Sequence, residues 1–89
     1  MQLLTRNESL MIRRNTHMRA LFIEYPRHEH TDVNASLFDL NHPDSRFNLP
    51  VVTAHARGIQ VRIPALLAGM FELKIQDGKQ RFSKRIALQ

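Results

Sequence analysis

The stretch FELKIQDGKQRFSKRIAL, residues 71–88, decides the fold of this 89-residue chain. In its first part, apolar side chains occupy every second position, at Phe71, Leu73 and Ile75, and polar side chains lie between them. This period of two is typical of a β-strand with one buried face, because a helix would scatter the same side chains around its circumference. The stretch therefore opens with a half-buried strand.

A tight turn and a second strand follow. The dipeptide Asp77-Gly78 tolerates positive φ and favours a short hairpin turn. Residues 80–88 then return with apolar side chains on one face and Lys84 as the polar interruption, the apolar ones being Phe82, Ile86 and Leu88. We therefore predict an antiparallel hairpin over residues 71–88.

Working outward, five earlier segments carry the alternation or the β-branched and aromatic composition of strands. Residues 59–63 are the clearest, since three branched apolar side chains alternate there with two polar ones. Pro50 confines the strand that contains it to a sheet edge or a bulge, because proline cannot donate to the ladder. The predicted strands are residues 9–13, 18–25, 33–40, 47–53 and 59–63.

No segment of about ten residues or more shows the period of an amphipathic helix, and residues 64–69 suffice for one helical turn. Short strands separated by turn residues favour two packed sheets. We expect an all-β fold, an immunoglobulin-like two-sheet sandwich of six or seven antiparallel strands. Residues 8–89 would form this single β-sandwich domain, and residues 1–7 a flexible N-terminal segment.

The composition excludes several classes of protein. Cysteine is absent, which removes disulfides, thiolate zinc sites and thiol nucleophiles. No apolar run approaches the roughly 20 residues of a membrane-spanning helix, and no secretory signal peptide is visible. The glycines lack phosphate-loop spacing, and no zinc-finger, RNA-recognition or helix-turn-helix motif is present. We therefore expect that the chain is not an enzyme and holds no cofactor.

The net charge of +5 is unevenly distributed. Residues 46–89 carry eight Lys or Arg against two acidic residues, whereas residues 1–45 carry five against six. The hairpin would gather cations in one patch, which we predict to be the partner-binding surface: Lys74, Lys79, Arg81, Lys84 and Arg85. Two other interpretations stay open: a solvated edge that resists aggregation, and a surface that attracts nucleic acid through charge alone.

Two short polar motifs contain candidate chemistry. His28 and His30 are separated by one residue, and on a strand this spacing places both imidazoles on one face, as in part of a zinc or copper site. A third ligand would have to come from elsewhere, so a solvated loop is the alternative. The second motif, His42-Pro-Asp44 followed by Ser45, has the residue types of a hydrolytic triad. No nucleophile elbow accompanies it, and a turn accounts for it.

Three stretches resemble a known family: residues 33–40, residues 58–78 and residues 83–89, the last reading SKRIALQ. Their pattern is similar to that of the C-terminal sorting domains of the bacterial type IX secretion system. In that family an "I-x-I-x-x-L-x-x-G-x-Y" segment precedes "V-x-I" and a final basic strand reading "K-K-I". The matching positions here are Leu66 or Leu67, Gly69, Phe71 in place of the usual Tyr, Lys84, Arg85 and Ile86.

This resemblance implies an immunoglobulin-like sandwich at the tail of a larger exported protein, with an extracellular or periplasmic location. The segment that begins at Pro64 is also similar to the "P-x-L-x-x-G-x-W-x-L-x-I" segment of FixH-like and YtkA-like periplasmic domains, which are associated with metal homeostasis and oxidase assembly. Their Trp is missing here, as is the membrane helix of FixH.

We expect a non-catalytic interaction module that serves export or sorting. A protein partner of the secretion machinery would recognise the C-terminal hairpin, with Lys84 and Arg85 as the residues to test, and could add a strand at the sheet edge. The alternatives are a metal-handling periplasmic domain that uses His28 and His30, and electrostatic nucleic-acid binding by the basic C-terminal half. The oligomeric state stays open.

Overall fold

The structure is a computed structural model, and it describes residues 10–15, 19–27, 32–42, 44–65 and 67–88. All regular structure among these residues is β, and the predicted flexible segment at residues 1–7 lies outside them. The strands are β1 (Met11–Asn15), β2 (Ala20–Glu24), β3 (Val33–Asp39), β4 (Arg46–Leu49), β5 (Val51–His55), β6 (Gly58–Arg62), β7 (Gly69–Asp77) and β8 (Gln80–Leu88).

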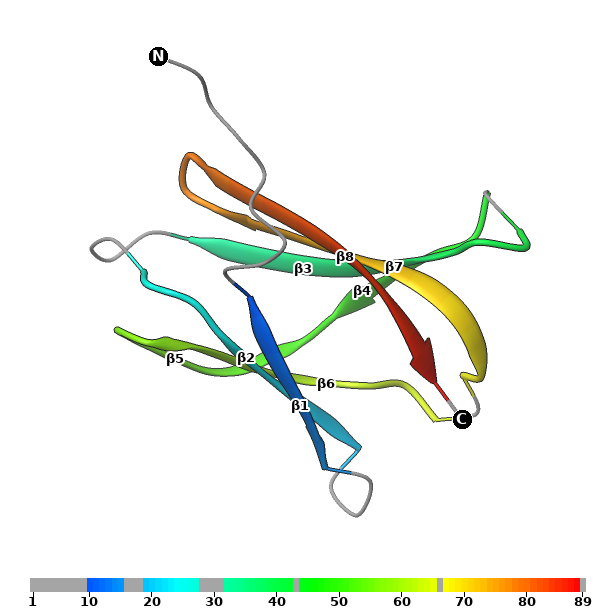
Figure 1. The fold of residues 1–89 in the computed structure, drawn as a ribbon, viewed down its shortest axis with the longest axis horizontal. Coiled ribbons are helices and arrows are strands. Elements are labelled where there is room, and N and C mark those ends of the chain that lie inside the picture. The colour runs from blue at the N-terminus through cyan, green and yellow to red at the C-terminus, as the bar shows by residue number, and fades with distance from the viewer. Residues whose placement is uncertain (1–9, 16–18, 28–31, 43, 66, 89) are drawn as a thin grey trace.

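The strands form two antiparallel sheets that pack face to face (Figure 1). One four-stranded sheet has the order β1-β2-β6-β5, and the other has the order β4-β3-β7-β8. In the lettering of immunoglobulin domains, the first is the A-B-E-D sheet, and the second is the C-F-G sheet with one extra strand beside C. The prediction of an all-β, immunoglobulin-like sandwich is therefore confirmed.

Pro50 explains why eight strands form in the described residues where six or seven were expected. The segment predicted as one strand over residues 47–53 divides at this proline: β4 pairs with β3 in one sheet, and β5 pairs with β6 in the other. Proline has no N–H to donate, so the ladder ends there. The Pro50 carbonyl still accepts the N–H of Arg62 at 3.0 Å, which attaches the crossing chain to the second sheet.

One hydrophobic core fills the space between the sheets. The apolar residues predicted for β7, Phe71, Leu73 and Ile75, are all buried, at 2% exposure or less. Burying a side chain of this size contributes roughly 1.5–3 kcal/mol, so the alternation seen in the sequence is a large part of what stabilises the sandwich. The facing sheet contributes equally buried side chains, namely Leu21, Ile23, Ile59 and Val61.

Gly58 allows β6 to approach β2 closely. Its φ is 153°, and a Cβ at this position would lie 2.1 Å from the carbonyl oxygen of Ile23. Any larger residue would therefore push these two central strands apart, which makes glycine a requirement of the pairing.

The β7–β8 hairpin closes through a two-residue turn, Gly78 and Lys79, between the paired residues Asp77 and Gln80. Gly78 has a φ of 62° at the first turn position, as in a type II′ turn. The sequence interpretation placed Asp77 in the turn as well, and this is wrong. Asp77 ends β7 and is 2% exposed, because side chains from another segment bind its carboxylate inside the molecule.

Candidate protein-binding surface

The strand register arranges polar side chains in rows on the outer face of the β4-β3-β7-β8 sheet. Paired residues share a face, so each set of pairings forms a row across the strands. We call the residues of these rows the basic face: Arg46, Phe38, Glu72 and Arg85 in the first row, Asn48, Ser36, Lys74 and Ser83 in the second, and Asn34, Gln76 and Arg81 in the third.

Positive charge dominates the basic face. It contains four cations, all exposed, and one acidic residue, Glu72. Among the described residues, no salt bridge joins any of the four to a carboxylate. Four positive charges against one negative charge leave this surface with a net positive charge, which acts on whatever approaches it.

Phe38 lies among these cations. The Lys74 Nζ is 4.9 Å from the centroid of its ring, and the Arg46 guanidinium carbon is 5.7 Å from it. Each cation–π contact at such a site is worth about 0.5–1 kcal/mol, which helps to hold both side chains in place. The sequence reasoning missed Phe38 and Arg46. The alternation in β3 could have placed Phe38 on the outer face, because Asn34, Ser36 and Phe38 occupy every second position.

A shallow groove of about 430 Å³ crosses the basic face. Lys74 and Arg81, on β7 and β8, line one half of the groove, and Arg46 and Phe38, on β4 and β3, line the other half. Ser36, which is 8% exposed, also lines the groove. The groove thus combines three cations and one carboxylate, Glu72, with neutral hydrogen-bonding groups, and its net positive charge suits an anionic, hydrogen-bonding ligand.

The structure divides the five predicted patch residues. Lys74, Arg81 and Arg85 lie on the basic face, and Lys79 lies in the adjoining turn. Lys84 lies on the other side of β8, because it pairs with the fully buried Leu73. Its aliphatic stem borders the core, and its ammonium can still reach water at the sheet edge.

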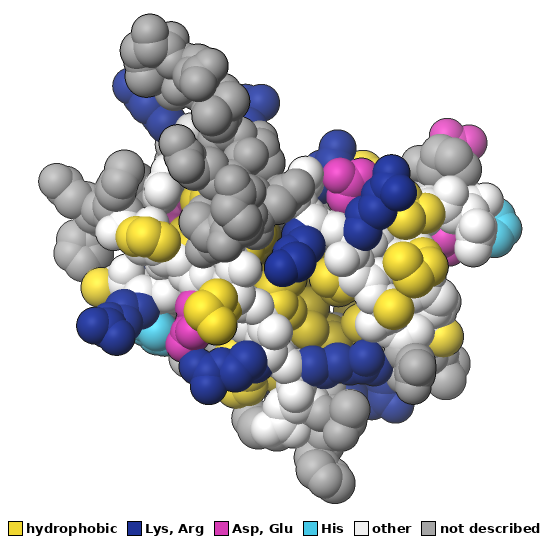
Figure 2. Space-filling view, in the orientation of Figure 1, with side chains coloured by type: hydrophobic (Ala, Val, Ile, Leu, Met, Phe, Trp, Pro, Cys, Tyr) yellow, Lys and Arg dark blue, Asp and Glu magenta, His cyan; other side chains and the backbone are white. Residues whose placement is uncertain are grey.

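Strand β8 is at one edge of its sheet, and β1 is at one edge of the other. Near the end of β8, an Arg14 N–H donates to the carbonyl of Ala87 at 3.3 Å and so links the two sheets. Figure 2 shows this side of the molecule, where hydrophobic side chains are visible between groups of Lys and Arg. Charged residues at a sheet edge also discourage pairing with other chains.

The outer face of the β1-β2-β6-β5 sheet has a different charge pattern. It carries a groove of about 370 Å³, lined in part by Arg13, Phe22, Glu24 and His55. Arg13 and Glu24 form a salt bridge of 2.5 Å, so the charge of Arg13, one of the two arginines that line this groove, is compensated. The two grooves have similar volumes, but a salt bridge holds an arginine of this groove and, among the described residues, none holds a cation of the groove on the basic face.

A buried polar cluster supports the base of the hairpin. Asp77 accepts hydrogen bonds from the Tyr25 hydroxyl at 2.7 Å and from Arg27 Nε at 2.6 Å. Arg27 also donates to the carbonyl of His55 at 3.4 Å, which brings in the β5–β6 turn. The hydrogen bond to Asp77 raises the pKa of Arg27, so the guanidinium stays charged. Burial, followed by the hydrogen bond to Asp77, raises the pKa of Tyr25, so the hydroxyl keeps its proton.

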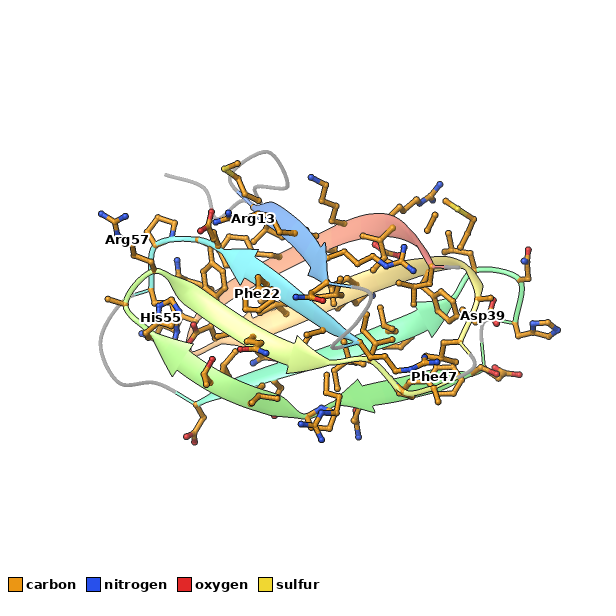
Figure 3. All side chains as sticks on the ribbon, turned by 90° about the horizontal axis from the view of Figure 1, so that it is seen from below. Arg13, Phe22, Asp39, Phe47, His55 and Arg57 are labelled. Atoms are coloured by element: carbon orange, nitrogen blue, oxygen red, sulfur yellow. The ribbon has the colours of Figure 1, made fainter. Side chains whose placement is uncertain are left out.

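The metal motif at His28 and His30 stays a prediction, and the motif at His42 is a turn, as the sequence indicates. His28 and His30 lie outside the described residues, and within those residues no three His, Asp or Glu side chains gather as a metal site would require. His42 is exposed and lies 3.3 Å from an Asp39 carboxylate oxygen. The backbone N–H of Asn41 donates to Asp39 and lowers the pKa of that carboxyl, as in an ordinary turn. Asp39 lies at the opposite end of the molecule from His55 (Figure 3).

In the part of the chain that the structure describes, there is no helix with the length and apolar character needed to cross a membrane. No protein-family model matches the chain, and no curated protein is similar to it in sequence.

Proposed function

We propose that this chain is a non-catalytic interaction module that binds a protein partner through the basic face, and that it serves as an export or sorting module read by a secretion partner. The observation that carries the proposal is the set of four exposed cations on one sheet face with no salt bridge among the described residues. Complementary charge steers partners and fixes their orientation. The sequence also suggested that a partner could add a strand at the β8 edge, and this stays a separate prediction.

The setting of Phe38 favours a protein partner over nucleic acid. Proteins that bind single-stranded nucleic acid without a sequence motif stack bases on open aromatic rings. Phe38 is the one aromatic residue of the basic face, and its ring already contacts Lys74 and Arg46. A base would have to displace these cations, whereas a carboxylate would bind to them directly.

The family resemblance supports the export role through two charged positions on β8. Phe71 is buried, and Leu67 and Ile86 pack against the core, so the likeness at these positions concerns the fold. Of the matching positions, Lys84 and Arg85 are the ones with charge at the surface of β8. Recognition by a partner would therefore depend on this basic strand.

Photo-crosslinking in the native host tests whether a partner binds this face. A photoreactive residue replaces Asn48 on the basic face in one variant and Thr53 on the outer face of the other sheet in a second, both positions being exposed strand residues. We expect a defined protein adduct from position 48 and none from position 53. Equal labelling from both positions, or none from 48, would contradict the proposal.

Charge reversal tests the same surface through export. A reporter enzyme that carries the chain should lose secretion when Lys74→Glu and Arg85→Glu are combined. The control combines Arg57→Glu with Arg62→Glu, which changes the net charge equally at exposed positions away from the basic face. Thermal unfolding by circular dichroism checks that both variants fold. Unchanged export of a folded Lys74→Glu, Arg85→Glu variant would exclude the sorting role.

A further inference from the structure

The cations that line the groove lie on a diagonal across the sheet. Arg46 is in the first row on β4, Lys74 is in the second row on β7, and Arg81 is in the third row on β8. All three line the groove, whereas Arg85, in the first row on β8, is not among its lining residues. Glu72 also lines the groove, but it lies in the first row on β7 and so off this diagonal. The positive charge of the groove therefore follows a line and not a compact cluster.

The length of this line can be estimated from strand geometry. Neighbouring strands lie about 4.8 Å apart, and each residue advances about 3.4 Å along a strand. Three strand steps and four residues separate Arg46 from Arg81, which places their backbones roughly 20 Å apart. Lys74 falls between them, roughly 12 Å from Arg46 and 8 Å from Arg81. An extended peptide of about seven residues spans this distance.

We infer that the groove binds an extended acidic peptide segment of the partner, laid diagonally across the strands, with three carboxylates that face Arg46, Lys74 and Arg81. This inference rests on the proposed function and names the chemistry of the partner. In an extended chain, side chains separated by an even number of residues share one side. Spacings of four and then two residues, about 14 Å and 7 Å, match the two intervals between the cations.

The neutral groups of the groove fit the same ligand. Ser36 lines the groove in the second row beside Lys74, and Asn34 and Gln76 line it in the third row with Arg81. Their amide and hydroxyl groups can both donate and accept hydrogen bonds. A peptide backbone crossing the sheet offers N–H and C=O groups to such partners. The phosphate backbone of a nucleic acid can accept hydrogen bonds from these side chains, but it has no N–H group to donate to their oxygen atoms.

The test is fluorescence anisotropy with labelled, end-capped peptides and the full chain. The probe is ETSTETE, in which the acidic residues have spacings of four and two. KTSTKTK is the counterpart of opposite charge, and a heptathymidine strand represents nucleic acid. At about 150 mM salt, where the screening length is about 8 Å, we expect ETSTETE to bind at least about tenfold more tightly than either.

Variants then locate the peptide on the diagonal. Arg46→Gln, Lys74→Gln and Arg81→Gln should each weaken ETSTETE binding by about threefold to fivefold, the upper part of the range for a single exposed ion pair. Arg85→Gln removes the same charge from the same face outside the groove, so its loss should be smaller than any of these. Arg62→Gln, on the outer face of the other sheet, should leave the affinity unchanged.

The outcomes separate this inference from the proposed function. Equal affinity for ETSTETE and KTSTKTK, or an Arg85→Gln loss as large as the three groove variants show, would overturn the diagonal site. Tighter binding of the heptathymidine strand would assign the groove to nucleic acid instead. If photo-crosslinking from position 48 captures a partner while ETSTETE fails to bind, the proposed function stands and the acidic segment is wrong. If photo-crosslinking from position 48 and ETSTETE binding both fail, the proposed function and the acidic segment are both wrong.

Discussion

Two salt bridges with the same chemistry lie in opposite environments. Arg27 and Asp77 meet at 2.6 Å, and their side chains are 8% and 0% exposed. Arg13 and Glu24 meet at 2.5 Å, and their side chains are 69% and 42% exposed. The distances are nearly equal, so burial decides what each pair contributes. Removing one partner inside the molecule leaves an uncompensated charge, whereas an exposed partner returns to water.

The comparison separates charge that serves folding from charge that is available for binding. Asp77 is held by Arg27 and Tyr25, and Arg27 also bonds the β5–β6 turn, so this pair fixes the end of the sandwich from which β8 begins. The cations of the basic face have no salt-bridge partner among the described residues. The buried pair therefore positions the base of the hairpin, whereas the exposed cations of the basic face are the ones that the proposed function assigns to a partner.

The largest effect is expected from breaking the buried pair. Asp77→Ala leaves the Arg27 guanidinium buried without its carboxylate and removes the acceptor of the Tyr25 hydroxyl. We expect a loss of about 3–5 kcal/mol in the free energy of unfolding. Urea denaturation followed by circular dichroism measures it. A loss below about 1 kcal/mol would mean that water reaches the pair.

A double variant sharpens the same point. Arg27→Met combined with Asp77→Leu replaces both charges by apolar side chains, so no unpaired charge stays in the interior. Replacing a whole buried pair is often close to neutral, and we expect the double variant to be more stable than Asp77→Ala by about 2 kcal/mol or more. If the double variant is the less stable one, the polar contacts themselves and not the uncompensated charge stabilise this region.

The next effect comes from the hydroxyl that joins the cluster. Tyr25→Phe keeps the ring, whose centroid lies 4.9 Å from that of Phe82, and removes only the donor to Asp77. Because Asp77 keeps Arg27 as a partner, we expect a loss of about 1.5–3 kcal/mol, as for a hydrogen bond to a charged group. The urea midpoint should fall without a change in the denaturant slope.

Alkaline pH should act on the same hydroxyl. The pKa of Tyr25 is raised by burial above its ordinary value near 10, so above about pH 10 the unfolded chain releases this proton while the folded chain keeps it. The folded state then binds more protons, and stability must fall as pH rises. Tyr25 is the one tyrosine of the chain and there is no tryptophan, so tyrosinate absorbance reports this residue alone. A midpoint at pH 10 in the folded protein would contradict the buried cluster.

The fold was largely predictable because its signal is local. Alternation in β6, β7 and β8 assigns each side chain to a face, and the fold follows when the apolar faces pack together. The sequence did not show which strands and side chains pair when they are far apart in the chain. Pro50 suggested an edge or a bulge, but only the register shows that β4 and β5 belong to different sheets. Asp77 looked like a turn residue because its partner Arg27 is distant in sequence.

The candidate site was predictable in part for the same reason. Lys74, Arg81 and Arg85 share a face because neighbouring strands of one hairpin carry them. Arg46 and Phe38 join them through β3 and β4, and no local pattern predicts which strand becomes the neighbour of β7. Lys84 was grouped by charge although its alternation with Phe82 and Ile86 placed it on the inner side. Periodicity was the better guide there than charge.

The smallest effect is expected at the exposed pair. Arg13→Ala leaves Glu24 in contact with water, so we expect a loss below about 0.5 kcal/mol, and still less at high salt. A double-mutant cycle with Glu24→Ala, measured by urea denaturation, gives the coupling energy directly. A coupling above about 1 kcal/mol would show that the environment does not separate the two pairs. A value near zero would mean that Arg13 and Glu24 contribute to the charge pattern of their face and not to the stability of the sandwich.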